Sequence, residues 1–421
     1  MKKHIFSICL LALLGAIFQN INAQHTNTPD KAVFVEGKGS YYINTILKDI
    51  RAYDEQATEP EPPKKGFKLQ VADKNYPTNP DDYQQQWHQK PISQGNTGTC
   101  WCFSTTSFFE SEIKRISGKA IKLSELYPVY FEYVERARLF VQKRGHVNIG
   151  EGSETNAVAK LYKKYGVVPL EAYKGKPDRL KFHNHEKMFA EFDGYLKNVK
   201  STNAWDEDRV VETVKSILNY YMGEPPTEFM LCGKKITPLE YLKSECKLNM
   251  DDYVDFMSLM QEPYFTKTIY DVPDNGWRST DYYNVPLNDF TSLIKTAIKK
   301  GYTISIGGDV SEAGFVNTAN VAVVPTFDCP AEYIDENARQ MRFLNGSTTD
   351  DHAMHLVGVT EKNGETWYLL KDSSSGSRGC AEGEACKQFG YYFMREDYVK
   401  LKMMTVTLHK DAVKDLIAKV K

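Results

Sequence analysis

The chain has 421 residues, of which 41% are hydrophobic and 26% are charged. A chain of this length buries about 75% of the surface that it exposes when unfolded, and its composition excludes wholesale disorder, collagen-like repeats and coiled coil. The formal net charge of -2 lacks the basic excess of proteins that neutralise phosphates, so we expect no nucleic-acid partner.

The N-terminus has the pattern of an export signal. Lys2 and Lys3 precede an uncharged, largely apolar run over residues 5–18, and Ala23 supplies a small residue soon after it. This order is typical of a secretory signal peptide, and the run is shorter than the ~20 residues of a membrane-spanning helix. We therefore predict a signal peptide over residues 1–23, cleavage near Ala23, a periplasmic or secreted mature protein and no stable membrane insertion.

Residues 24–90 follow as a polar, irregular segment. Residues 59–66 within it have the Pro- and Gly-containing composition of a linker, which disfavours a continuous helix or strand. We interpret the whole segment as an N-terminal arm wrapped on the core, or as a removable pro-segment.

Further along the chain, the apolar pattern predicts helices first and strands later. A helical stripe runs through residues 100–116, and a second helix over residues 154–165 ends at Gly166. Residues from about 180 to 300 are charged and aromatic, with several helical stretches. The expected strands lie at residues 302–307, 356–359 and 367–370. This distribution predicts an α+β protein with two differently built lobes.

The cysteine count bears on the redox state of the protein. Cys9 falls in the predicted signal and leaves an odd number of the 8 cysteines, so at least one thiol stays unpaired in an oxidising compartment. Cys380 with Cys386 is one candidate pair, and Cys232 with Cys246 is another. Buried free thiols are an equal alternative.

The most informative stretch is residues 94–104, where a loop rich in Gly and Thr runs into the helix with Cys100 at the junction. Backbone N–H groups at a helix start stabilise a thiolate, and a thiolate is a competent nucleophile for acyl transfer. Cys102 lies about 200° further around the helix, so it should point away from the site. The alternative for Cys100 is a buried structural cysteine.

The residues around Cys100 resemble the nucleophile segment of the papain-like cysteine peptidases. Gln94 precedes the cysteine, Trp101 follows it directly, and Phe103-Ser104 closes the pattern. The resemblance implies that Cys100 attacks the scissile carbonyl, that the Gln94 side chain and the Cys100 N–H form the oxyanion hole, and that no cofactor is needed. Two donors aimed at the developing oxyanion stabilise a tetrahedral intermediate.

The imidazole that shares the proton should lie in the stretch that leads into an apolar strand and holds His352 and His355. A turn at Asn363-Gly364 predicts a hairpin that returns the chain to Asp372. Strict two-residue pairing places Asp372 opposite His355, whereas the family pattern of His-Ala followed by apolar residues selects His352. We predict His352 as general base and acid with Asp372 as its orienter, and we expect a longer loop or a bulge that Gly364 supplies. His355 should face the other side of the strand as a packed or surface residue.

Asp372 departs from the family pattern. The family usually has Asn there, followed by Ser, Trp and Gly, whereas this chain continues with Ser373, Ser374, Ser375 and Gly376. An Asp still accepts a hydrogen bond from the imidazole and should hold the imidazolium more strongly. The missing Trp removes a ring that usually shields this hydrogen bond.

Four further segments resemble bleomycin hydrolase and bacterial aminopeptidase C: residues 163–169, 223–229, 237–241 and 390–394. The resemblance implies a papain-like peptidase domain over residues 91–421, with a helical lobe, a β-barrel-like lobe and a large helical insertion at about 180–300. It implies a peptide or protein substrate and leaves open the assembly of a homo-oligomer.

The same resemblance places a substrate groove beside the nucleophile. A Gly-Gly pair that often lines the groove appears here as Gly152 and Ser153, and Gly permits close approach of an extended peptide. We also expect Trp101 and Asp351, the sequence neighbours of the nucleophile and the base, to contact the substrate.

Several functions stay open beside this prediction. Those relatives restrict cleavage to peptide N-termini through a C-terminal arm, and this chain ends at Lys421 soon after its last helical stretch, so both aminopeptidase and endopeptidase action are considered. A transglutaminase-like acyltransferase, which also uses Cys, His and Asp, is one rival. A catalytically inactive homologue that binds peptides is another. Histidine pairs such as His183 and His185 lack zinc-finger spacing, so we predict no metal.

Overall fold

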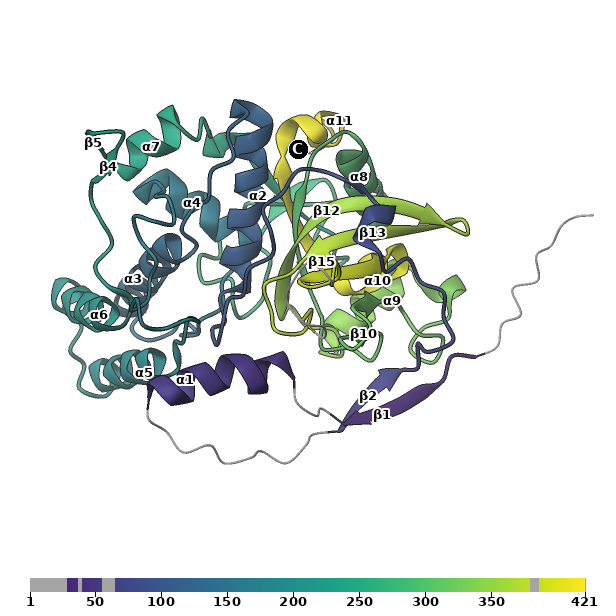
Figure 1. The fold of residues 1–421 in the computed structure, drawn as a ribbon, viewed down its shortest axis with the longest axis horizontal. Coiled ribbons are helices and arrows are strands. Elements are labelled where there is room, and N and C mark those ends of the chain that lie inside the picture. The colour runs from purple at the N-terminus through teal and green to yellow at the C-terminus, as the bar shows by residue number, and fades with distance from the viewer. Residues whose placement is uncertain (1–28, 37–39, 55–64, 379–385, 421) are drawn as a thin grey trace, which may run out of the picture.

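The computed structural model describes residues 29–36, 40–54, 65–378 and 386–420. The predicted signal peptide, residues 1–23, and its cleavage point near Ala23 lie outside these ranges. Helices gather in one lobe and a large sheet forms the other, with the C-terminal segment on the sheet side (Figure 1). This is the two-lobed α+β architecture that the sequence predicts.

The first lobe consists of amphipathic helices whose apolar faces form one core. Its helices are α2 (Cys100–Ser117), α3 (Leu126–Gln142), α4 (Thr155–Tyr165), α5 (Glu186–Ser201), α6 (Glu207–Met222) and α7 (Pro238–Ser244), and a small hairpin of β4 (Phe229–Leu231) and β5 (Lys234–Ile236) precedes α7. Gly118 ends α2 and Gly166 ends α4, with φ of 74° and 77°, a backbone conformation that strains other residues. The two helices predicted from the apolar periodicity are therefore confirmed.

The second lobe is a large mixed sheet with helices packed against it. In spatial order its strands are β10 (Phe315–Val316), β11 (Val321–Ala322), β14 (Tyr391–Arg395), β13 (Glu365–Lys371), β12 (His352–Lys362), β9 (Ile304–Gly308), β15 (Met403–His409), β6 (Tyr253–Met257), β8 (Tyr282–Asn284) and β7 (Thr266–Thr268), and β3 (Gln84–Gln85) pairs with β12. Its helices are α8 (Leu287–Lys299), α9 (Glu336–Leu344), α10 (Glu396–Lys402) and α11 (Lys414–Ile417). Of the region at about 180–300, the part up to Ser244 is largely helical, whereas the chain from Tyr253 onward adds strands to this sheet.

The turn between β12 and β13 is the tight turn that the sequence predicts. Asn363 and Gly364 both have positive φ, 54° and 81°, as a two-residue hairpin turn requires. The sequence-based prediction put a bulge at Gly364, and this is wrong, because the pairing shifts between Leu356 and Gly358, inside the strand. The turn itself closes without an extra residue.

The bulge decides which histidine shares a face with Asp372. The extra residue is Val357, whose carbonyl accepts a hydrogen bond from the Gln86 backbone N–H at 2.8 Å. The neighbouring N-terminal segment therefore supports the bulge. Beyond it, His355 pairs with Lys371. A shift of one residue in the pairing moves a side chain to the other face of the sheet. Asp372 therefore lies on the same face as His352, the predicted base.

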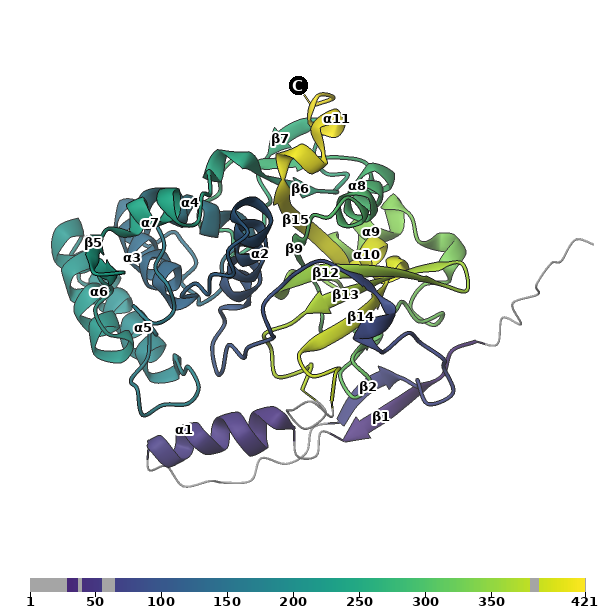
Figure 2. The ribbon, with the colours of Figure 1, turned by 45° about the horizontal axis from the view of Figure 1, so that its top comes forward.

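Helix α2 joins the two lobes by packing against β12 and β9 (Figure 2). Buried hydrogen bonds fix this contact: Thr105 Oγ1 lies 3.1 Å from Ser305 Oγ, and Ser107 Oγ lies 2.8 Å from His355 Nδ1. The predicted nucleophile is the first residue of α2, and the predicted base is the first residue of β12. The interface between the lobes therefore positions both.

The N-terminal segment packs on the core. A two-stranded antiparallel sheet of β1 (Ala32–Glu36) and β2 (Lys65–Leu69) lies on the side of the large sheet. The helical stretch between these strands, made of Tyr42–Leu47 and α1 (Lys48–Tyr53), runs beneath the helical lobe (Figures 1 and 2). Ile46 and Ile50 are buried in a cluster with Leu180 and Phe182. Over the described ranges, no helix has both the length and the hydropathy to cross a membrane.

Most cysteines of the described chain are free thiols. They are Cys100, Cys102, Cys232, Cys246 and Cys329. The candidate pair of Cys232 with Cys246 is therefore wrong. Cys386 is disulfide-bonded, and its candidate partner Cys380 lies outside the described residues.

Candidate active site

Cys100 stands at the start of α2, between the two lobes. The Thr99 carbonyl accepts hydrogen bonds from the N–H groups of Cys102 (3.0 Å) and Phe103 (3.1 Å), which closes the first helical turn behind the sulfur. The half-buried Cys100 lines a cavity of about 330 Å³. The same cavity is lined by six other predicted site residues, Gln94, Trp101, Gly152, Ser153, Asp351 and His352.

Cys102 is turned away from this cavity, as the helical spacing predicts. Its buried thiol donates to the Glu125 carbonyl at 3.1 Å, inside the helical lobe. Burial raises the pKa of Cys102 well above its ordinary value. Of the two neighbouring sulfurs, only that of Cys100 is therefore suited to nucleophilic attack.

His352 lies between Cys100 and Asp372. Its Nε2 is 2.7 Å from Asp372 Oδ1, and the residue lines the same cavity as Cys100. Burial alone would lower the pKa of His352, but the negative charges of Cys100 and Asp372 raise it well above its ordinary value. The arrangement therefore favours the protonated, imidazolium form of His352 beside the ionised Asp372 carboxylate.

Asp372 is buried and remains ionised. Burial alone would raise its pKa, but the charge and hydrogen bond of His352, followed by the charge of Arg378 and the hydroxyl of Ser374, hold the pKa well below its usual range. Ser374 Oγ donates to Asp372 Oδ2 at 2.6 Å and accepts from the Gly376 N–H at 3.2 Å. Ser374 occupies the position where the family has Trp, so a hydrogen bond to the second carboxylate oxygen accompanies the change from Asn to Asp.

The Gln94 side chain is held at both of its polar atoms. Its Nε2 donates to the Thr97 carbonyl at 2.7 Å, and its Oε1 accepts from Ser373 Oγ at 2.7 Å. An amide nitrogen carries two hydrogens, so one remains for the cavity that Gln94 shares with Cys100. Ser373, which also accepts the Gln94 backbone N–H at 2.9 Å, is a positioning residue that the sequence analysis missed, although it directly follows Asp372.

The predicted groove residues have different surroundings. A Cβ on Gly152 would lie 2.1 Å from Asp274 Oδ2, so only glycine fits there. Ser153 Oγ donates to Glu132 Oε1 at 2.8 Å, away from the groove. Trp101 is buried and donates to the Glu151 carbonyl at 3.1 Å. The Asp274 carboxylate thus requires glycine at residue 152, while Ser153 and Trp101 hold the wall of the groove.

Asp351 is the exposed member of the predicted groove residues. Its Oδ1 accepts a hydrogen bond from the Val310 N–H at 2.9 Å, in the loop after β9. Partial burial of its carboxyl group and the nearby charge of Asp309 raise the pKa of Asp351. One oxygen of the Asp351 carboxylate therefore holds this loop at the rim of the cavity.

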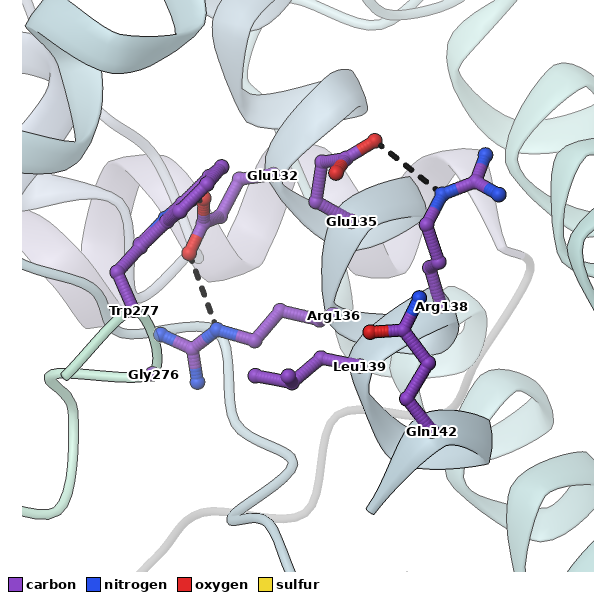
Figure 3. A pocket seen from close by; sticks show the side chains of 8 residues that line it. All are labelled: Glu132, Glu135, Arg136, Arg138, Leu139, Gln142, Gly276 and Trp277. Atoms are coloured by element: carbon purple, nitrogen blue, oxygen red, sulfur yellow. Dashed lines mark hydrogen bonds and ion pairs between the residues drawn. The ribbon is translucent and has the colours of Figure 1, made fainter. Parts of the chain in front are cut away.

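A buried ion pair supports the groove wall from behind (Figure 3). Arg136 Nε lies 3.0 Å from Glu132 Oε1, and Trp277 Nε1 donates to Glu132 Oε2 at 2.8 Å. Arg136 also donates to the carbonyls of Gly152 (2.8 Å) and Asp274 (2.7 Å). Arg136 thereby links the segments of Gly152 and Asp274, which form this side of the cavity.

Three carboxyl side chains of the cavity were missed from the sequence: Glu154, Asp274 and Asp350. The sequence could have indicated two of them, because Glu154 directly follows the predicted groove residue Ser153 and Asp350 directly precedes the predicted groove residue Asp351. No sequence neighbour indicated Asp274, because it reaches the cavity from a loop that is distant along the chain.

The other histidines considered lie elsewhere. His355 is buried behind the base, next to Ser107, which confirms it as a packed residue on the opposite face. His185 Nδ1 lies 3.2 Å from the Tyr133 hydroxyl, inside the helical lobe. In the part of the chain that the structure describes, no three His, Cys, Asp or Glu side chains are grouped as metal ligands.

The sequence and the fold were compared with known proteins. The sequence pattern of the Peptidase C1-like family matches residues 146–421. Aminopeptidase E of Lactobacillus helveticus is 26% identical over 373 residues, which cover 77% of this chain and 81% of that protein. Bleomycin hydrolase of Gallus gallus is 24% identical over 381 residues, which cover 78% and 82% of the two chains.

Among solved structures, pepw from lactobacillus rhamnosis has a similar fold. The two chains superpose with a TM-score of 0.65 at 18% identity, over 81% of this chain and 85% of that chain. The helical lobe and the large sheet are thus part of a shared fold. The chain belongs to the Peptidase C1-like family, in its bleomycin hydrolase and aminopeptidase C branch, and has the two-lobed papain-like fold.

Proposed function

We propose that the protein is a cysteine peptidase that hydrolyses peptide bonds through Cys100, His352 and Asp372. The observation that carries the proposal is the position of His352, which lines one cavity with Cys100 and whose Nε2 lies 2.7 Å from Asp372 Oδ1. Relatives of the chain are named aminopeptidases and bleomycin hydrolases, which supports hydrolysis of peptide or amide bonds.

In this proposal, the Cys100 thiolate attacks the scissile carbonyl carbon. The Cys100 N–H and the free hydrogen of Gln94 Nε2 donate to the oxyanion that forms. The His352 imidazolium gives its proton to the leaving amine as the C–N bond breaks, which leaves a thioester on Cys100. His352 then takes a proton from water, the hydroxide attacks the thioester, and the acid product and the thiol are released.

Aminopeptidase and endopeptidase action differ in whether a free α-amino group must lie close to the scissile bond. We propose to separate them with pairs of peptides that are identical except for N-terminal acetylation. Aminopeptidase action requires the free amine, whereas endopeptidase action tolerates the acetyl group and cuts inside longer peptides.

The first test is labelling of the purified, reduced protein with an epoxide inhibitor of papain-like enzymes, read by intact and peptide mass spectrometry. We expect one adduct on Cys100 that is lost in Cys100→Ala and strongly slowed in His352→Ala. Cys102→Ala is the matched control, since its sulfur is buried two residues away and faces Glu125, and it should label like the wild type.

Two outcomes would overturn the proposal. Failure of the folded, reduced protein to label at Cys100 favours an inactive homologue that binds peptides. Labelling without peptide cleavage, but with transfer of an added amine onto glutamine side chains, favours a transglutaminase-like acyltransferase.

A further inference from the structure

The cavity beside Cys100 has an acidic wall that the chemical steps of peptide hydrolysis leave unused. The wall consists of Glu154, Asp274 and Asp350, all of which line the cavity. Glu154 directly precedes α4, Asp274 lies between β7 and β8, and Asp350 lies just before β12. Three distant parts of the chain thus bring carboxyl groups to one place.

The carboxyl groups of Asp274 and Asp350 lie against the glycine backbone of the cavity. A Cβ on Gly152 would lie 2.1 Å from Asp274 Oδ2, and a Cβ on Gly307 would lie 3.6 Å from Asp350 Oδ1. The two carboxyl groups therefore lie directly against the backbone that lines the cavity at Gly152 and Gly307. A substrate in the groove therefore passes within reach of both.

Within the described residues, no ion pair joins a basic side chain to these three carboxyl groups, although the charge of Arg136 acts on Asp274. Glu154 is 5% exposed, and the neighbouring polar group with which it interacts is another carboxyl, that of Asp350. Asp350 Oδ2 is buried without a hydrogen-bond partner in the described part of the chain. Arg136, behind the wall, is paired with Glu132 and donates to backbone carbonyls. The three carboxyl groups thus line the cavity without a neutralising ion pair.

The mutual repulsion of these groups supports a cationic ligand. Burial and the charges of Asp350 and Asp274 raise the pKa of Glu154 well above its ordinary value. Burial also raises the pKa of Asp350 to about 7. A positive charge that enters the cavity stabilises the ionised forms, because an opposite charge nearby favours ionisation of a carboxyl.

We propose that the acidic wall of Glu154, Asp274 and Asp350 binds a cationic group of the substrate next to the scissile bond. The shared chemistry is an ammonium or guanidinium group, supplied either by the free α-amino terminus or by a Lys or Arg side chain. Charge-assisted hydrogen bonds to carboxylates are strong, and a neutral substrate leaves buried carboxyls unpaired. The inference rests on the proposed peptidase function and names its substrate class.

The test compares fluorogenic amide substrates that differ in one charge. One pair is alanyl-aminomethylcoumarin with and without an N-acetyl group, which probes the α-amino source. The other pair is N-acetyl-Arg-Gly-aminomethylcoumarin and its citrulline analogue, which is neutral and has nearly the same shape, and it probes the side-chain source. We expect the cationic member of at least one pair to have kcat/KM about tenfold higher, since one tenfold step corresponds to a single favourable charge contact.

The variants Glu154→Gln and Asp350→Asn keep the side-chain shapes and remove the charge. We expect each to reduce the preference for the cationic substrate about tenfold, mainly through KM. Asp178→Asn is the matched control, since Asp178 is exposed and pairs with Lys174 far from the site. Thermal unfolding and epoxide labelling of Cys100 verify that each variant is folded.

A second measurement does not depend on turnover. Binding of the Arg and citrulline peptides, and of the free and acetylated alanine amides, to Cys100→Ala is measured by calorimetry. Equal affinities and equal kcat/KM within both pairs would overturn the inference, and so would an equal loss for all substrates in Glu154→Gln. If Cys100 is labelled and neutral peptides are cut without any preference for cations, only this inference fails. If nothing is labelled or cut, the proposed function fails.

Discussion

Replacing Asp372 by Asn removes one negative charge beside His352 and keeps the shape of the side chain. The wild-type carboxylate lies 2.7 Å from His352 Nε2, and Ser374 Oγ, which donates to the second carboxylate oxygen, can instead accept from an amide. We therefore expect Asp372→Asn to fold. Its effect should appear in the charge state of His352 and not in the position of the ring.

The expected magnitude follows from the contact distance. An opposite charge within 4–6 Å shifts a pKa by about 1–3 units, so loss of the Asp372 charge should lower the pKa of His352 by about 1–3 units. That shift corresponds to about 1.4–4 kcal/mol of stabilisation of the imidazolium. Since the wild-type pKa of His352 is raised well above its ordinary value, the imidazolium persists to alkaline pH in the wild type and is lost at lower pH in the variant.

The assay is the pH profile of kcat/KM with a neutral blocked peptide, for the wild type, Asp372→Asn and the remote control Asp178→Asn. We expect the alkaline limb of Asp372→Asn to lie about 1–3 pH units below that of the wild type, and the control to superpose on the wild type. An alkaline limb that does not move would refute the reasoning, because Asp372 would then not stabilise the imidazolium.

The same pair predicts a pH dependence of stability. The pKa of His352 is raised in the folded protein, so its contribution is complete below about pH 6.5 and is lost as pH rises through the folded value. The pKa of Asp372 is lowered, so its contribution is present above about pH 4 and is lost as pH falls through the folded value. The wild type should therefore exceed Asp372→Asn in unfolding free energy most strongly between about pH 4 and 6.5, as urea titrations at several pH values will test.

Three further predictions concern other parts of the chain. Gln94→Ala should lower kcat by about 10²–10³, because one oxyanion donor is lost; an unchanged kcat in steady-state assays would exclude that role. Arg136→Met leaves Glu132 as an uncompensated buried charge behind the groove, so it should cost about 3–5 kcal/mol of unfolding free energy, and a denaturation midpoint equal to that of the wild type would contradict this. Expression of the full chain in a host with an export pathway should yield a protein that lacks residues 1–23, and N-terminal sequencing of an uncleaved product would contradict the predicted signal.

The nucleophile could be predicted from the sequence because its signals are local. A loop rich in Gly and Thr, a helix start and Cys100 follow one another along the chain, and helix geometry alone separates Cys100 from Cys102. The Asn363-Gly364 turn is equally local, since both residues favour the left-handed conformation that the turn requires.

The choice between His352 and His355 depended on a long-range feature. Simple counting from the turn favours His355, and only the bulge at Val357 brings Asp372 to the face of His352. The Val357 carbonyl in that bulge accepts a hydrogen bond from the N–H of Gln86, which lies far away along the chain in the N-terminal segment. Without a partner for its carbonyl, the extra residue would leave a buried polar group unsatisfied.

The sequence by itself determined the two lobes, the nucleophile at its helix start, the candidate base and orienter, and the family resemblance, because these depend on periodicity and on neighbouring residues. Only the tertiary structure decided the position of the bulge, the hydrogen bond from Ser374 to Asp372, and the acidic wall of Glu154, Asp274 and Asp350. The physical reason is that the bulge and the acidic wall join groups that lie far apart along the chain and meet only through packing, while the Ser374 hydrogen bond depends on the conformation of the loop after β13. A local sequence pattern does not predict which distant side chains line the same cavity, or which donor forms a hydrogen bond with a given buried oxygen.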